Sequence, residues 1–229
     1  MIDSNLKLIY EDIADIKAKN NIGYPVNLMA VSKTFPKESV LEAINWGQTL
    51  FGENRILEAF DKFLPIKESD KTFNLHIIGH LQRNKSKEAV IISTMIESVD
   101  KIETLDAIEK EATKLNKKMD FLIEINTSFE PQKYGINPDD IFRFIETIQK
   151  NNYGFCNLRG VMTVGPLTDD KNKIRESFRL LKKLFDKVKS NLNKNDFDTI
   201  SMGMSGDYRI AIEEGSNQLR IGSAIFGSR

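Results

Sequence analysis

The feature that most constrains the fold of this chain is a repeated alternation between short apolar runs and longer stretches with helical spacing. The short runs are rich in β-branched residues, and several are apolar at successive positions. That pattern is typical of parallel strands that are covered on both faces. The predicted strands are 26–33, 49–51, 75–78, 95–100, 121–126, 158–163, 199–204 and 218–221.

Amphipathic segments separate these strands. They are predicted from apolar residues three and four positions apart, and from end signals such as Pro36 before and Gly47 after one of them. The expected helices cover 37–46, 53–63, 81–93, 101–118, 138–150, 173–192 and 207–214, and a further helix at 4–20 precedes the first strand.

This order predicts an α/β protein with a single domain over residues 1–229, folded as a (β/α)8 TIM-type barrel with an extra N-terminal helix. The residues after the last strand are too few for a full outer helix, so we expect the N-terminal helix to fill that gap in the ring. An open doubly wound sheet is the alternative, because strand order is not visible in one sequence.

Composition narrows the class of function. Hydrophobic residues make up 40% of the chain and charged residues 29%, which excludes a disordered chain. The 33 basic residues balance 33 acidic ones, so we expect neither nucleic acid nor an anionic membrane as a partner. The single cysteine, Cys156, excludes an internal disulfide and is expected in the connection before the sixth strand; two histidines exclude the usual zinc sites, so no metal is expected.

The apolar runs are too short to span a membrane, and the first residues lack the layout of a signal peptide. We therefore expect a cytoplasmic protein. A barrel whose rim is covered can stand alone, so a monomer is expected.

In a barrel of this type, active sites lie at the C-terminal ends of the strands. Lys33 ends the first predicted strand, after the apolar run 28–31. Partial desolvation at the barrel mouth lowers a lysine pKa and frees the amine for Schiff-base formation. The alternative is a lysine that only caps a strand end in water.

Two segments near the C-terminus are suited to phosphate. Residues 201–207 (SMGMSGD) leave the seventh strand and enter a short helix, so Ser205 and Gly206 would lie at a helix N-terminus, where amides and the dipole favour anions. An ordinary turn is the alternative.

Residues 220–227 (RIGSAIFG) leave the eighth strand. Gly222 permits close backbone approach and Ser223 adds a hydroxyl, so the two segments together predict a phosphate cup. Arg220 lies in a strand that should be buried, and it therefore needs a carboxylate or a ligand as its partner.

At this point several motifs match a known family. The chain resembles the pyridoxal phosphate homeostasis proteins, also called proline synthetase co-transcribed proteins, whose fold resembles the N-terminal barrel of alanine racemase. The resemblance runs from about residue 30 to residue 227. The motifs that carry it are AVSKTFP (30–36), FGENRILEA (51–59), HIIGHLQRNK (76–85), SVD (98–100), LRGVMTVGP (158–166), SMGMSGDYRIAIEEG (201–215) and RIGSAIFG (220–227).

The resemblance implies pyridoxal 5′-phosphate (PLP) as the cofactor and Lys33 as the residue that holds it, in an internal aldimine. It also implies that Arg220 faces the pyridine nitrogen. That cation would keep the nitrogen unprotonated and the ring a weak electron sink. The remaining positions implied are Ser205, Gly222 and Ser223 at the phosphate, the amide of Gly206 beside them, and Asn54 and His76 along the pocket.

The family implies a non-catalytic carrier or buffer in intracellular PLP homeostasis, which exchanges its cofactor with PLP-dependent apo-enzymes or with enzymes of vitamin B6 salvage. A PLP-dependent amino-acid racemase is the alternative. It needs proton donors on both faces of the ring, and only Lys33 is an obvious one, although Tyr134 or Tyr208 could serve. A third interpretation, a phospho-sugar aldolase with Lys33 as its Schiff-base lysine, leaves the motif match unexplained.

Overall fold

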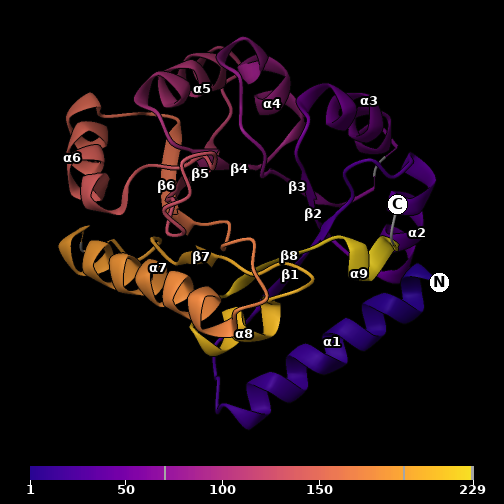
Figure 1. Ribbon diagram of the computed structural model, residues 1–229. Helices are drawn as coiled ribbons and strands as arrows, with labels where there is room; N and C mark the ends of the chain where they lie inside the picture. Colours follow the sequence, from indigo (N-terminus) through magenta and orange to yellow (C-terminus); the bar gives the residue numbers. More distant parts are fainter. Residues whose placement is uncertain (70, 193, 228–229) are drawn as a thin grey trace.

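Parallel strands form a closed barrel in the computed structural model, which describes residues 1–69, 71–192 and 194–227 (Figure 1). The strands follow one another around the barrel in chain order, and β8 pairs in parallel with β1. The predicted barrel is therefore confirmed, and the open sheet is excluded. The strands are β1 (Asn27–Val31), β2 (Leu50–Glu53), β3 (Asn74–Ile77), β4 (Met95–Val99), β5 (Met119–Glu124), β6 (Cys156–Met162), β7 (Thr199–Ser201) and β8 (Gln218–Ile221).

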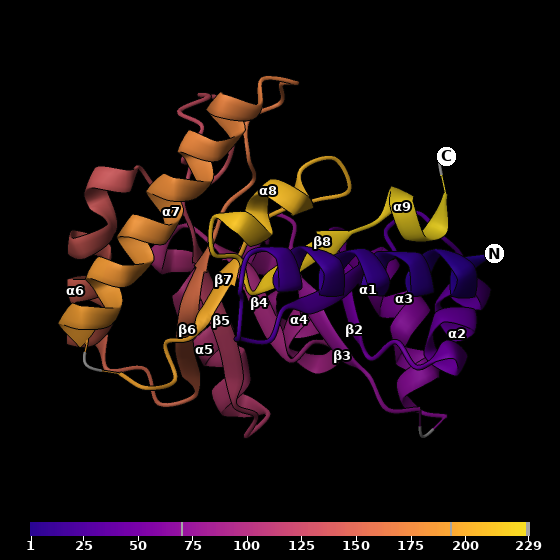
Figure 2. The same ribbon diagram turned by 90° about the horizontal axis from the view of Figure 1, so that it is seen from below.

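Helices form a ring around the outside of the barrel (Figures 1 and 2). Within the described ranges, none of them is long and apolar enough to cross a membrane. They are α1 (Ile2–Lys19), α2 (Lys37–Trp46), α3 (Ile56–Lys67), α4 (Ser86–Ile92), α5 (Ile102–Lys114), α6 (Ile141–Asn151), α7 (Lys171–Leu192), α8 (Tyr208–Glu213) and α9 (Ser223–Phe226), with 3-10 turns η1 (Arg83–Lys85) and η2 (Pro138–Asp140).

The strands are buried on both faces, which explains their unbroken apolar runs. In β1, Leu28 and Ala30 join the large core between strands and helices. Met29, between them, faces the barrel interior beside Gly52, where an added Cβ would lie 2.4 Å from the Met29 sulfur. The successive apolar positions are therefore buried on both faces of the strand.

The barrel interior combines a small apolar cluster with buried polar groups. Met95, Leu122 and Met162 form the apolar cluster. The polar side chains come from five strands, and each is almost wholly shielded from solvent. They are His76, Glu97, Glu124, Ser201, Gln218 and Arg220.

The N-terminal helix closes the ring, as the sequence predicts. Helix α1 packs against α2, α8 and α9 (Figure 2). The Asn5 side-chain amide donates to the Ile225 carbonyl at 2.8 Å, and the Tyr208 hydroxyl donates to Asp12 at 2.6 Å. Helix α1 is thereby fastened to α8 and α9, the last two helices of the described ranges.

Three local predictions are wrong. Glu53, predicted as the start of a helix, is the last residue of β2, because its fully buried carboxylate pairs with Lys62. Cys156, expected in a connection, begins β6 and is buried. The short helix α9 was not expected, because a four-residue helix leaves no periodic pattern in the sequence.

The packing of α1 generates a test. Leu6 is 0% exposed and Leu8 is 62% exposed on the same helix. We expect Leu6→Ala to lower the free energy of unfolding by about 2–5 kcal/mol, because it leaves a cavity in the core. Leu8→Ala, the matched control, should change it by less than about 0.5 kcal/mol. Urea unfolding measures both, and equal effects would contradict the role of α1 as part of the ring.

Candidate functional site

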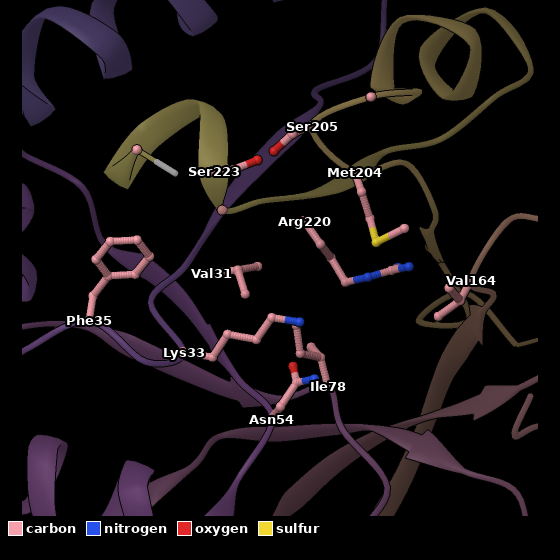
Figure 3. A pocket seen from close by; sticks show the side chains of 13 residues that line it. Val31, Lys33, Phe35, Asn54, Ile78, Val164, Met204, Ser205, Arg220 and Ser223 are labelled. Carbon is pink, nitrogen blue, oxygen red and sulfur yellow. The ribbon is translucent and has the colours of Figure 1, made fainter. Parts of the chain in front are cut away.

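A cavity of about 450 Å³ opens at the C-terminal ends of the strands (Figure 3). Its volume lies within the range of small-molecule sites, roughly 300–1,000 Å³. Loops that follow β1, β2, β3, β6, β7 and β8 contribute to it. The lining residues are Val31, Lys33, Phe35, Asn54, Ile78, Val164, Met204, Ser205, Gly206, Arg220, Gly222, Ser223 and Gly227.

Seven of the eight residues that the sequence singles out line this one cavity. Figure 3 shows the Lys33 amine and the Arg220 guanidinium reaching into it, and the hydroxyl groups of Ser205 and Ser223 pointing toward one another. Lys33 is half-buried at the end of β1. An amine, a guanidinium and two hydroxyls around one hollow are suited to a small anionic ligand that carries an electrophile.

The loops after β7 and β8 are tied together at the hydroxyl end of the cavity. The Ser205 hydroxyl accepts a hydrogen bond from the Ala224 N–H at 3.3 Å. A Cβ on Gly222 would approach the Val31 carbonyl oxygen to 3.2 Å, so a glycine lets this turn lie close against β1. A Cβ on Gly206 would meet nothing within 4 Å, so that part of the lining leaves open space for a ligand group.

The loop that carries Lys33 rests on a buried ion cluster. The Lys62 ammonium donates to the Ser32 carbonyl and to Glu53 Oε1, both at 2.8 Å, and to Glu58 Oε1 at 3.1 Å. The Ser32 hydroxyl donates to Glu53, and the Thr34 N–H donates to Glu58. Both chain neighbours of Lys33 are thus held by one cluster, although Thr34 has a positive φ of 68°.

Asn54 follows β2 and presents an amide to the cavity. Its Oδ1 is buried and has no hydrogen-bond partner among the described residues. Because a buried polar atom without a partner is costly, this oxygen marks a position where a ligand donor would be stabilising.

Arg220 lies at the inner end of the cavity, on β8, and is 4% exposed. Its NH1 donates to the Ser201 hydroxyl and its NH2 to the Thr163 carbonyl, both at 2.7 Å. Burial lowers the pKa of Arg220 from its ordinary value, while Glu97, Glu124 and Asp207 oppose that shift. The guanidinium keeps its charge, because its ordinary pKa lies far above neutral pH.

The structure does not put His76 along the cavity, contrary to what the resemblance implies. Its Nδ1 lies 2.7 Å from Glu97 Oε1 inside the barrel, and the residue is 7% exposed. Side chains on one face of a strand recur every second residue. Ile78, two positions further along, therefore takes the lining position, and His76 lies one layer deeper.

Sequence reasoning also missed the apolar lining and the buried ion clusters. Ile78 directly follows β3 and Val164 lies two residues after β6, so the rule that places barrel sites after the strands could have found them. The pairing of Lys62 with Glu53 has a weaker signal, because only the fold brings the α3 lysine beneath the loop after β1.

The Lys62 cluster generates a prediction. Lys62→Met should lower the free energy of unfolding by about 3 kcal/mol, because it leaves the buried Glu53 carboxylate without its cation. Lys182→Met, which removes an exposed pair with Asp186, should change it by about 0.5 kcal/mol or less. Urea unfolding of both variants measures the difference. A loss in Lys62→Met no larger than in Lys182→Met would contradict the anchoring role of the cluster.

Glu124 predicts a pH dependence. Burial, with repulsion from Asp100 and Glu97, raises its pKa from 4.5 to about 7 against the attraction of Arg220. A carboxyl whose pKa is raised on folding stabilises fully below its unfolded pKa, and this stability is lost as the pH rises through the folded value. Relative to Glu124→Gln, the wild type should lose about 3 kcal/mol as the pH rises from below 4.5 to above 7. Urea unfolding of both proteins across that interval measures the loss, and parallel stability curves would contradict it.

Comparisons with known proteins agree with this fold. Residues 5–229 match the family model described as alanine racemase, N-terminal domain. The protein named pyridoxal phosphate homeostasis protein in Pasteurella multocida is 34% identical over 229 residues, which are 100% of this chain and 97% of the relative. The protein of that name in Aquifex aeolicus is 36% identical over 88% of this chain and 86% of its own length.

A solved structure extends the likeness. PipY of Synechococcus elongatus, in the structure with PLP bound, is 28% identical and superposes with a TM-score of 0.80 over 94% of this chain and 100% of PipY. The chain therefore belongs to the family of pyridoxal phosphate homeostasis proteins, which is built on the barrel of the alanine racemase N-terminal domain.

Proposed function

We propose that this protein holds PLP in the cavity as a Schiff base on Lys33 and takes part in PLP homeostasis as a carrier or buffer. The observation that carries this function is the arrangement of the Lys33 amine and the Ser205–Ser223 hydroxyl pair around one cavity of about 450 Å³. The relatives named for PLP homeostasis and the PLP-bound PipY support the choice of ligand.

The lining residues fit the chemical groups of PLP. This cofactor supplies a phosphate dianion and an aldehyde that condenses with an amine with loss of one water. Lys33 supplies the amine. Ser205 and Ser223 supply hydroxyls for the phosphate, and Gly206 leaves room for it. Hydroxyls and backbone amides at helix N-termini are common ligands of phosphate.

Two further groups suit the ring. The unpartnered Asn54 Oδ1 is an acceptor along the cavity wall. By resemblance, Arg220 would face the pyridine nitrogen, and its guanidinium would disfavour a second positive charge there. A ring nitrogen without its proton withdraws electrons weakly, which supports holding the cofactor over carbanion chemistry.

The surroundings of the tyrosines also favour a carrier over a racemase. A racemase needs a second proton donor on the ring face opposite the lysine. Among the described residues, no tyrosine lines the cavity. The Tyr208 hydroxyl is bonded to Asp12 on α1, and Tyr134 stacks on His80 with ring centroids 4.2 Å apart.

Lys33→Ala tests the proposal. The wild type incubated with PLP should gain a visible absorption band and a borohydride-reducible bond that peptide mass mapping assigns to Lys33. The variant should lose both. It should still bind PLP through the proposed phosphate contacts, with an affinity at least about tenfold lower than that of the wild type. Lys85→Ala is the control, since Lys85 lies in η1 outside the cavity and faces Glu88 at 3.9 Å.

Three outcomes would contradict parts of the proposal. A reducible bond that persists in Lys33→Ala would move the Schiff base to another lysine. Racemisation of amino acids by the PLP-loaded wild type would make the protein an enzyme. Absence of any band in the wild type would exclude PLP as its ligand.

A further inference from the structure

We propose that Glu97, inside the barrel, is the positioning residue for Arg220. It would act through the Ser201 hydroxyl to fix the place of the guanidinium at the inner end of the cavity and to balance its charge. Its effect on the bound ring rests on the PLP binding proposed above. Glu97 does not line the cavity, whereas Arg220 does, so the proposed influence on a ligand is exerted through Arg220.

Glu97 links strands on opposite sides of the barrel. It extends from β4 and is 0% exposed. Its Oε1 lies 2.7 Å from His76 Nδ1 on β3 and accepts from Gln218 Nε2 on β8 at 2.6 Å. Its Oε2 accepts from the Ser201 hydroxyl on β7 at 2.6 Å. A buried carboxylate with this many partners is a fixed point of the interior.

The Ser201 hydroxyl connects Glu97 to Arg220 by two hydrogen bonds. A serine has one proton to donate, and Glu97 Oε2 accepts it. The hydroxyl oxygen is therefore left as an acceptor, and Arg220 NH1 donates to it at 2.7 Å. The order carboxylate, hydroxyl, guanidinium has only one arrangement of protons. The Thr163 carbonyl holds the second nitrogen, NH2, at 2.7 Å.

The charge of Arg220 also indicates Glu97 as its partner. Arg220 is a buried cation, and an isolated buried charge is strongly disfavoured. Of the three carboxyls that favour its charged form, Glu97 has the largest effect, followed by Glu124 and Asp207. Only Glu97 is also joined to Arg220 through a single bridging hydroxyl. Its carboxylate therefore provides both position and counter-charge.

The partners of Glu97 supply a matched pair of variants. Ser201 and Gln218 both donate to Glu97, but only Ser201 leads on to Arg220. Ser201→Ala removes the link without removing a charge. Gln218→Met removes a Glu97 contact of similar burial and leaves the link in place. A role of Glu97 in packing alone predicts similar effects for both variants.

The experiment compares absorption spectra of PLP-loaded proteins between pH 6 and 9, together with PLP affinity. We expect Glu97→Gln and Ser201→Ala to displace the band maximum or its pH midpoint and to weaken PLP binding about tenfold, as for loss of one hydrogen bond to a charged group. Gln218→Met should keep the wild-type spectrum. Glu109→Gln is a second control. That carboxylate accepts from the Gly154 and Cys156 N–H groups, which are not part of the link from Glu97 to Arg220.

A ligand-free measurement completes the test. In urea unfolding without PLP, the Glu97→Gln and Ser201→Ala double variant should unfold near the midpoint of the less stable single variant, because both changes break one chain of contacts. Folded variants with wild-type spectra, or additive effects on unfolding, would overturn the role of Glu97. A wild type without any PLP band would instead refute the proposed function, while the unfolding result would still decide the link between Glu97 and Ser201.

Discussion

The parallel pairing of β8 with β1 is the constraint on which the rest of the structure depends. It aligns Ala30 with Ile221, so the residues that follow each strand meet at one edge of the barrel. Lys33 from the beginning of the chain then shares a cavity with Gly222 and Ser223 from its end. The absence of a side chain at Gly222 allows the final turn to lie against the Val31 carbonyl. An open sheet made of the same strands would separate the Lys33 amine from the Ser205 and Ser223 hydroxyls.

Closing the barrel also buries charges, and two of the buried clusters hold residues of the cavity in place. On one side, Lys62 pairs with Glu53 and holds the Ser32 carbonyl, while Glu58 accepts from the Thr34 N–H, so the cluster holds both chain neighbours of Lys33. On the other side, Glu97 is linked to Arg220 through Ser201. Buried ion pairs add little net stability, because desolvation offsets their attraction, but their short hydrogen bonds fix the geometry of the groups that they join. The cost of these clusters is therefore consistent with a role in holding two cations in defined places.

Much of the fold could be predicted from the sequence because the barrel leaves a strong local pattern. Burial on both faces produces continuous apolar runs, which predicted the strands, and the outer helices produce a period of three to four residues, which predicted most of the helices. The position of α1 in the ring was predicted as well. The sites after β1, β7 and β8 followed from the rule that barrel ligands bind at C-terminal strand ends. Local pattern failed at Glu53, where a polar residue ends a strand because Lys62 is folded over it.

The same limit explains the errors within the site. His76 and Ile78 lie on the same face of the chain, and how far each lies from the end of the strand decides which of them reaches the cavity. The contacts of Glu97 join residues far apart in the chain, and no periodicity records them. Ser205 lies in a turn, as the alternative interpretation expected, and only the fold shows that Ser223 lines the same cavity.

The contact between α1 and α9 connects the first turns of the chain to the turn that carries Ser223. Asn5 holds the Ile225 carbonyl within the short helix that begins at Ser223, and Ile2, Leu6 and Ile225 belong to one apolar core. Opening of α1 and loosening of the turn after β8 should therefore occur in one cooperative unit. A ligand held at Ser223 would then suppress local opening at the N-terminus by mass action, without touching it. Occupancy of the cavity would then be measurable as slower hydrogen exchange in the first turns of α1.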